Sequence, residues 1–325
     1  MSYAKHLDPD MFKKSCKQEP IRSGFGRGLV KAGQQDERVV ALCADLTDST
    51  KMNGFRDAFP DRFVEIGIAE QNLASVSAGL AIAGRIPFSS SYAAFHPGRS
   101  FDQIRTSICM GELPVRIVGS HAGVSVGPDG ATHQMLEDIA LMRVLPHMVV
   151  VCPGDSVEAE KATLALAEDI ENPAYIRLAR EATPVFTTND SPFDLHRAHV
   201  LRKGTDITLA GTGTMTYQLL VAADLLAKKG IDAEVVHVPV VKPLDGATIL
   251  ASVNKTGKLV TAEEAQIAAG FGSAVIEFLS EHNPVPAMRI GVRDSYGQSG
   301  KPQELLEHFG LTGKQMAKQI TGFLN

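Results

Sequence analysis

The sequence predicts an α/β protein with two domains, each built on a mostly parallel sheet that helices flank. Three observations lead to this fold class. Short apolar runs alternate with helix-like segments, which favours parallel strands joined by helical crossovers. The 325 residues are enough for two domains of ordinary size. A polar, proline-containing stretch near residue 190 interrupts the alternation, which then restarts. We therefore expect domains at residues 1–190 and 191–325.

The first domain is expected to hold six strands and five helices. Each strand candidate is a short apolar run, and the segments between these runs have helical length. The expected strands cover residues 39–44, 63–68, 86–90, 115–119, 148–152 and 174–178, and the expected helices cover residues 21–32, 69–83, 101–110, 136–143 and 156–168.

A linker is expected over residues 181–196, because the run TTNDSP within it is polar and turn-forming. The alternation of apolar runs and helix-like segments then resumes in the second domain. Strands are expected at residues 207–210, 233–238, 258–261 and 287–291, and helices at 217–229 and 272–280.

The composition narrows the possible partners. The net charge of −5 gives no reason to expect a nucleic acid or a membrane surface as a partner. The four cysteines lie far apart, without metal-ligand or CxxC spacing, which suggests thiols in a reducing compartment. The N-terminus lacks an apolar signal core, and no stretch reaches the length of a membrane span. We expect a cytoplasmic protein.

The most informative stretch is GIAEQN, residues 67–72, which joins an apolar strand to a helix rich in Ala, Ser and Gly. It places the carboxylate of Glu70 where strand gives way to helix. A carboxyl group packed there loses water and can share a proton with a partner. The ordinary interpretation is an acidic residue that complements the dipole of the helix in its first turn.

A second informative stretch, residues 121–134, reads HAGVSVGPDGATHQ. Its three glycines and its proline indicate a tightly turned loop of the kind that displays side chains into a cleft. His121, Asp129 and His133 would then face a ligand, because histidine binds phosphate or moves protons near neutral pH. The ordinary alternative is a surface loop with incidental polar residues.

Aromatic and basic residues follow the expected strands. Tyr92 and Phe95 come after the strand at 86–90, where they would stack on a planar ring or simply belong to the core. Arg180 ends the strand at 174–178 and Arg22 begins the first helix. Because ligands gather at the carboxyl ends of parallel strands, a guanidinium group there suits a phosphate, although most arginines form surface ion pairs.

Together, the GIAEQN segment and the histidine-containing loop resemble the pyrimidine-binding half of a thiamine diphosphate enzyme, specifically a transketolase. The resemblance implies that the carboxyl group of Glu70 bonds to the pyrimidine of thiamine diphosphate and activates it. It implies pyrimidine stacking for Tyr92 and Phe95, and a place beside the cofactor for Asp45. Residues matching Asp129 and His133 contact the sugar or the reacting centre in that family, and those that match Arg22, Ser49, His121 and Arg180 grip the substrate phosphate.

The resemblance also implies a partner subunit. Transketolases carry a preceding domain, with a Gly-Asp-Gly motif and a later Asn, that holds the diphosphate through Mg²⁺ or Ca²⁺, and this sequence lacks that constellation. We therefore expect no metal site here, and a separate N-terminal-type transketolase subunit that supplies one. The assembly implied is a dimer of heterodimers that transfers a two-carbon ketol unit between sugar phosphates. The second domain, with Glu263 and Glu264, resembles the transketolase C-terminal domain, whose usual role is structural.

Other functions stay open at this point. A beta subunit of a 2-oxoacid dehydrogenase has a similar length and the same two-domain plan, but its substrate need not carry a phosphate. A deoxyxylulose-phosphate synthase is a further relative that normally comes as one longer chain. A rival from another class is a non-catalytic partner that binds or regulates another subunit.

Overall fold

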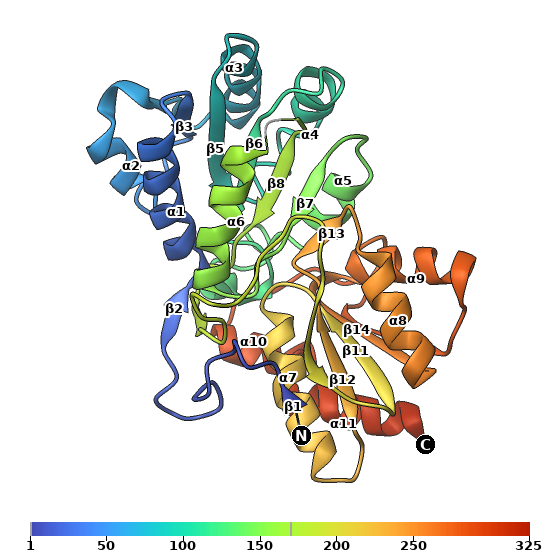
Figure 1. Cartoon of the computed structure of the whole chain (residues 1–325). Helices are drawn as coiled ribbons and strands as arrows, with labels where there is room; N and C mark the ends of the chain where they lie inside the picture. Colours follow the sequence, from blue (N-terminus) through green and yellow to red (C-terminus); the bar gives the residue numbers. More distant parts are fainter. Residues whose placement is uncertain (1, 170) are drawn as a thin grey trace.

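The computed structural model describes residues 2–169 and 171–325, and two sheets organise them into an upper and a lower lobe (Figure 1). The first sheet has seven strands in the order β13-β7-β8-β6-β5-β3-β4. All of its strands except β13 run parallel, and β3 and β6 are buried along their whole length. The parallel strands are β3 (Val39–Cys43), β4 (Phe63–Glu65), β5 (Ile86–Tyr92), β6 (Arg116–Ser120), β7 (Val149–Val151) and β8 (Ala174–Arg177).

Helices cover both faces of this sheet, and two of them cross at very short range. A Cβ atom at Gly24 in the first helix would lie 1.8 Å from the carbonyl oxygen of Ser156, so only glycine permits this crossing. The helical segments of the upper lobe are α1 (Ile21–Gln35), α2 (Asn53–Ala58), η1 (Pro60–Arg62), α3 (Glu70–Ile82), α4 (Phe101–Gln103), η2 (Ile104–Cys109), η3 (Val124–Asp129), α5 (Asp138–Arg143) and α6 (Ser156–Glu168).

The second sheet has the order β1-β10-β12-β11-β14-β15, with β1 and β10 antiparallel at one edge. Two mostly parallel sheets flanked by helices confirm the predicted fold class. The strands are β1 (Ser2–Tyr3), β10 (His199–Lys203), β11 (Ile207–Gly211), β12 (Ala233–His237), β14 (Leu259–Gln266) and β15 (Ala287–Val292), and the helices are α7 (Met215–Ala227), α8 (Gly246–Thr256), α9 (Phe271–His282), α10 (Pro302–His308) and α11 (Gly313–Leu324).

The two lobes exchange edge strands, which the sequence did not predict. Strand β1 from the N-terminus extends the lower sheet, with Tyr3 opposite Arg202. In return, β13 (Val240–Lys242) pairs antiparallel with β7 of the upper sheet, with Val240 opposite Val151. Each exchange covers a strand edge that would otherwise present unpaired backbone groups.

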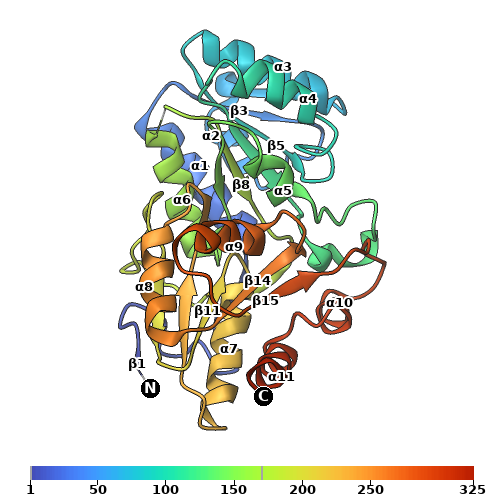
Figure 2. The same cartoon turned by 90° about the vertical axis from the view of Figure 1, so that its right-hand side faces the viewer.

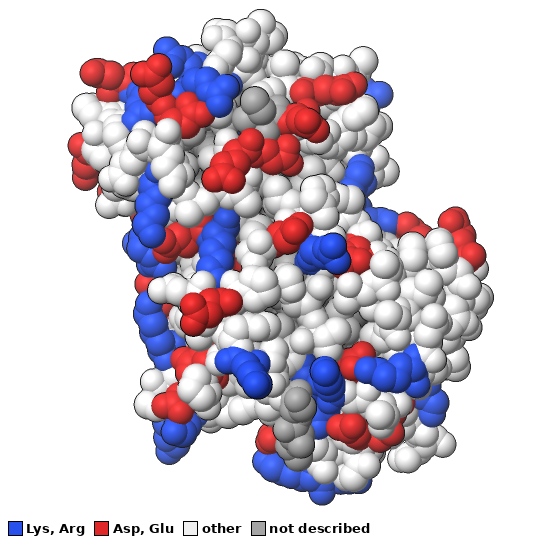
Figure 3. Space-filling model, viewed as in Figure 1, with Lys and Arg blue, Asp and Glu red and all other residues white. Residues whose placement is uncertain are grey.

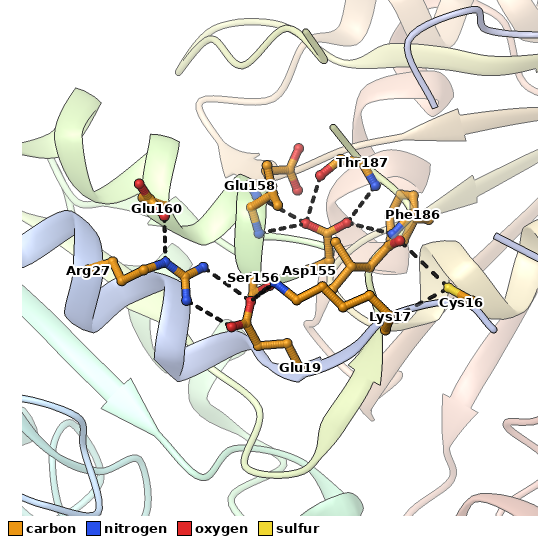
Figure 4. Close-up of polar contacts among 12 residues, drawn as sticks. Cys16, Lys17, Glu19, Arg27, Asp155, Ser156, Glu158, Glu160, Phe186 and Thr187 are labelled. Atoms are coloured by element: carbon orange, nitrogen blue, oxygen red, sulfur yellow. Dashed lines mark hydrogen bonds and ion pairs between the residues drawn. The ribbon is translucent and has the colours of Figure 1, made fainter. Parts of the chain in front are cut away.

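The segment predicted as a linker is fixed to the upper lobe. Part of it forms β9 (Ala182–Pro184), which pairs with β2 (Gln18–Pro20). The carboxylate of Asp155 caps α6 and also accepts hydrogen bonds from the amides of Phe186 and Thr187, at 2.9 and 2.7 Å (Figure 4). These hydrogen bonds hold the start of the linker against the upper lobe.

Several elements differ from the sequence predictions. The expected helix at 101–110 is one α-helical turn followed by a π-helical segment. Helix α8 was missed, although Asp245 caps its start and Gly257 ends it with a φ of 69°. Helices α2, α10 and α11 were missed as well, because they are short or lie outside the alternation of strands and helices.

The surface carries charges of both signs. On the face shown in Figure 3, Lys and Arg side chains are interspersed with Asp and Glu. In the part of the chain that the structure describes, no helix is both long and apolar enough to span a membrane.

Candidate active site

The predicted site residues lie at one edge of the upper sheet. Glu70 follows β4, Asp45 follows β3, Tyr92 ends β5, His121 follows β6 and Arg180 follows β8. These strands are parallel and occupy neighbouring positions in the sheet, so their carboxyl ends meet. This is the edge at which parallel α/β sheets bind ligands.

Glu70 is the first residue of α3, and its side chain is only 2% exposed. The chain turns into this helix through Gly67, which has a φ of 77° and donates its amide hydrogen to Glu65. Arg99 donates from Nη1 to Oε2 of Glu70 at 2.7 Å. The Arg99 guanidinium also lies 4.7 Å from the centre of the Phe95 ring. Arg99 therefore connects the buried acid to the aromatic part of the site.

Four rings pack together beside this arginine. The rings of Tyr92 and Phe95 are stacked, with centres 6.0 Å apart and planes inclined by 18°. The His121 ring stacks on Tyr92 at 3.8 Å, and the His133 ring meets Phe95 edge-on at 5.3 Å. Residues from the end of β5 and from both ends of the histidine-containing loop thus form one aromatic group.

His121 has a backbone φ of 58°, a conformation that only a small fraction of non-glycine residues adopt. Its Nδ1 lies 2.8 Å from Oγ of Ser120, and its Nε2 lies 3.4 Å from Nη1 of Arg22. Burial, together with the charges of Arg22 and Arg180, lowers the pKa of His121 to about 3. The imidazole is therefore neutral at physiological pH and accepts a hydrogen bond from Arg22 through Nε2.

Arg22 and Arg180 converge at the far end of the site. Arg22 donates to the carbonyl oxygens of Ser49 and Arg180, the latter at 3.2 Å. Arg180 donates to the carbonyl oxygen of Val126 at 2.6 Å, and its Nη1 lies 3.7 Å from the Asp129 carboxylate. Burial and the nearby Arg180 charge lower the pKa of Arg22. Two neighbouring cationic groups repel each other, and an anion bound between them would relieve that repulsion.

Asp45 stands apart from this series of contacts. It is exposed at the end of β3 with a φ of 57°, and its amide donates to Glu65 at 2.7 Å. Glu65 also accepts a hydrogen bond from the hydroxyl of Thr47 at 2.9 Å. Glu65 therefore shapes the turns after β3 and β4, and the sequence interpretation did not single it out.

The sequence interpretation did not identify Arg99, although this residue contacts both Glu70 and Phe95. Its only sequence signal is its position shortly after the aromatic pair, and that position does not reveal a partner at Glu70. Ser49 contacts Arg22 through its backbone carbonyl oxygen and not through its side chain. Across residues 2–169 and 171–325, no group of three or more His, Cys, Asp or Glu residues is placed to hold a metal ion.

Two family models match the chain. The model for the transketolase pyrimidine binding domain covers residues 18–185, and the model for the transketolase C-terminal domain covers residues 196–316. The 6-deoxy-6-sulfo-D-fructose transketolase subunit SqwH of Clostridium sp. (strain MSTE9) is 40% identical over 308 residues, which are 94% of this chain and 95% of that protein. An apulose-4-phosphate transketolase subunit of Phocaeicola vulgatus is 36% identical over 304 residues, 93% of this chain and 97% of that protein.

A solved structure shows the same fold. It is a split-gene transketolase in the form of an inactive β4 tetramer, 44% identical in sequence, with a TM-score of 0.87 over 94% of this chain and 98% of that one. The two family models, the full-length relatives and this structure agree, and the chain belongs to the transketolase family.

Proposed function

We propose that this chain is the pyrimidine-binding subunit of a split transketolase that transfers a two-carbon ketol unit between sugar phosphates. The observation that carries the proposal is the continuous series of contacts from a buried acid through an aromatic group to a pair of arginines. This order matches a heterocyclic cofactor at one end and a phosphorylated substrate at the other. The relatives described as subunits of transketolases support the same assignment.

The residues at the acid end fit the pyrimidine of thiamine diphosphate. Glu70 is buried, and one of its oxygens is already paired with Arg99, so the other is left to exchange a proton with a ring nitrogen. Tyr92 and Phe95 offer nearly parallel ring faces beside it. Thiamine diphosphate, when bound, supplies the nucleophilic carbon for breaking and forming carbon–carbon bonds beside a sugar carbonyl. Asp45 would border the cofactor from the end of β3.

The residues at the basic end would bind the substrate. Arg22 and Arg180 would take the phosphate, with neutral His121 and the Ser49 segment completing the pocket. Asp129 lies beside Arg180 and would accept hydrogen bonds from sugar hydroxyl groups.

His133 lies against the aromatic group, because its ring meets those of Tyr92 and Phe95 edge-on. It would orient the sugar and move protons near the reacting carbon, a role that an imidazole can fill.

The diphosphate and its Mg²⁺ or Ca²⁺ would belong to an N-terminal-type transketolase subunit, in a cytoplasmic dimer of heterodimers. The relatives described as subunits and as a split-gene enzyme support this partnership. Ile68, two residues before α3, and Ile82, its last residue, are each 75% exposed, and α3 lies with α4 at the edge of the upper lobe (Figure 2). This face suits the partner subunit. We further propose a domain boundary near residue 190, between the two matched models.

The test is reconstitution with a candidate N-terminal-type subunit. The co-purified pair, supplied with thiamine diphosphate and Mg²⁺, is assayed with a panel of ketose phosphate donors and an aldose phosphate acceptor. We expect ketol transfer by the pair and none by this chain alone. Turnover by the isolated chain would contradict the division of the site between two subunits. A stable pair that consumes no ketose phosphate would contradict the proposed reaction.

A further inference from the structure

The histidine loop, residues 121–134, belongs to the upper lobe in sequence but is seated on the lower lobe. Val124 belongs to the same buried apolar cluster as residues of α7, α11 and the lower sheet. The Gln134 side chain donates to the carbonyl oxygens of Val124 and Gly127 within the loop, and also to that of Gln298 in the lower lobe, at 2.9 Å. In Figure 2 the green segment before α5 accordingly lies beside the red segment before α10.

The closest link between loop and lower lobe is the carboxylate of Glu264. This residue lies on β14, is 2% exposed, and accepts a hydrogen bond from the amide of Ser125 at 2.7 Å through Oε1. Its other oxygen accepts from the hydroxyl of Thr214 at 2.9 Å. A Cβ atom at Gly123, whose φ is 91°, would lie 2.4 Å from Oε1, so the loop backbone closes directly over this carboxylate.

The loop also abuts the segment that precedes α10. A Cβ atom at Gly130 would lie 2.6 Å from the Ser299 hydroxyl, and one at Gly127 would lie 3.0 Å from the Pro302 ring. Both glycines have a positive φ, which other residues rarely adopt, and the lower lobe leaves little room for a side chain at either point.

The two lobes form hydrogen bonds with the loop at adjacent residues. Glu264 of the lower lobe holds the amide of Ser125, and Arg180 of the upper lobe holds the carbonyl oxygen of Val126. Asp129 follows three residues later, within contact of the same Arg180 side chain. The lower lobe therefore helps to set the position of Asp129, in addition to any role in assembly.

We propose that Glu264 is a positioning residue, which fixes the Ser125–Val126 turn so that Asp129 and His133 face the substrate and Arg180 stays turned toward the phosphate. The physical basis is a charge-assisted hydrogen bond inside a closed interface, which is stronger than a bond between neutral groups. The proposal rests on the proposed function for the identity of the substrate, but the loop contact itself does not depend on it.

The experiment compares Glu264→Ala with Glu263→Ala in the assembled pair. Glu263 is the matched control, because it is the neighbouring buried carboxylate and accepts two backbone hydrogen bonds, from Phe271 and Gly272 at the start of α9. Hydrogen–deuterium exchange of residues 121–134 is measured first, because it requires no activity. We expect exchange of the Ser125 region to accelerate about tenfold or more in Glu264→Ala and to stay unchanged in Glu263→Ala.

Kinetics and cofactor binding give the second readout. In Glu264→Ala we expect kcat/KM for ketose phosphates to fall about 10- to 100-fold. The affinity for thiamine diphosphate with Mg²⁺, measured by calorimetry, should stay at the wild-type value, because Glu70 and Phe95 lie on other segments. Glu264→Gln should recover part of the activity, since its amide oxygen can still accept from Ser125 but without the charge that strengthens the bond.

Unchanged exchange of the loop in Glu264→Ala would overturn the proposal, and so would an equal loss of kcat/KM in Glu263→Ala. If Glu264→Ala does not fold, Glu264→Asp replaces it, because the shorter side chain keeps the charge but withdraws the oxygen from Ser125. An assembled Glu264→Asp pair with wild-type exchange and kinetics would also overturn the proposal. Failure of the proposed function would appear differently, as a wild-type pair without ketol transfer whose loop still responds to Glu264→Ala.

Discussion

Arg99 and Glu70 form an ion pair of 2.7 Å between a half-exposed guanidinium group and a carboxylate that is almost fully buried. The same guanidinium lies over the Phe95 ring. Arg99 thus supplies the counter-charge of the acid at the point where the acid meets the aromatic group. A buried carboxylate without such a partner would lose much of its solvation without compensation.

Removing Arg99 should therefore destabilise the chain through Glu70. We expect Arg99→Met to lower the free energy of unfolding by about 1–3 kcal/mol, between the values typical of exposed and buried pairs. In the background of Glu70→Gln the same change should cost much less, since the charge is already gone. Chemical denaturation of the four proteins of this double-mutant cycle measures the coupling. Additive effects would show that the pair does not stabilise the fold.

Glu70→Ala should abolish ketol transfer in the reconstituted pair and leave the fold intact. The reason is that the variant loses the acid next to the rings of Tyr92 and Phe95, while α3 keeps its apolar packing. Steady-state turnover and circular dichroism together test this expectation. Asp102→Ala is the control, because Asp102 is an exposed acid in the first turn of α4. Equal effects of the two changes would indicate that Glu70 only complements a helix dipole.

Arg180→Ala should raise the KM for phosphorylated donors strongly and change the KM for unphosphorylated donors little. The charge of the Arg180 guanidinium group is close enough to lower the pKa of Arg22, so the two arginines form the cationic end of the site, and a neutral sugar makes no use of that charge. Initial rates with matched sugar and sugar phosphate donors measure the difference. A similar rise in KM for both donors would mean that Arg180 acts only by holding the loop at Val126.

His96→Gln should reduce the loss of stability in acid. His96 is fully buried between the hydroxyl groups of Ser89 and Ser100, and burial lowers its pKa to about 3. Because the pKa of His96 falls on folding, this residue binds a proton below about pH 6.5 in the unfolded chain but not in the folded chain. Stability is thus lost as the pH falls, by about 2 kcal/mol at pH 5 for this residue.

The matching measurement is the difference in unfolding free energy between pH 7 and pH 5, taken for wild type and for His96→Gln. We expect that difference to shrink by about 2 kcal/mol in the variant. The comparison with wild type is needed because Glu263 has the opposite effect on stability. Burial raises the pKa of Glu263 to about 7, so its contribution becomes more favourable as the pH falls. An unchanged difference would show that His96 does not carry this part of the acid sensitivity.

The sequence predicted the segments of the site well and their mutual contacts poorly. The strand and helix around Glu70 and the glycine-rich turns of the histidine loop depend on local patterns of apolar, small and turn-forming residues. The partner of Glu70 could not be predicted, because Arg99 reaches it from 29 residues away. The anchoring of the linker could not be predicted for the same reason, since its backbone amides at Phe186 and Thr187 bond to Asp155 in another element.

What the sequence by itself determined is the order of strands and helices, the two-lobed α/β plan and the chemical types gathered at the strand ends. Only the tertiary structure decided that β1 and β13 change lobes, that Arg99 neutralises Glu70 and that Glu264 lies beneath the histidine loop. The physical reason is that periodicity and turn preferences act between neighbours along the chain. Ion pairs and buried hydrogen bonds depend on the burial and distance that arise when remote segments pack together.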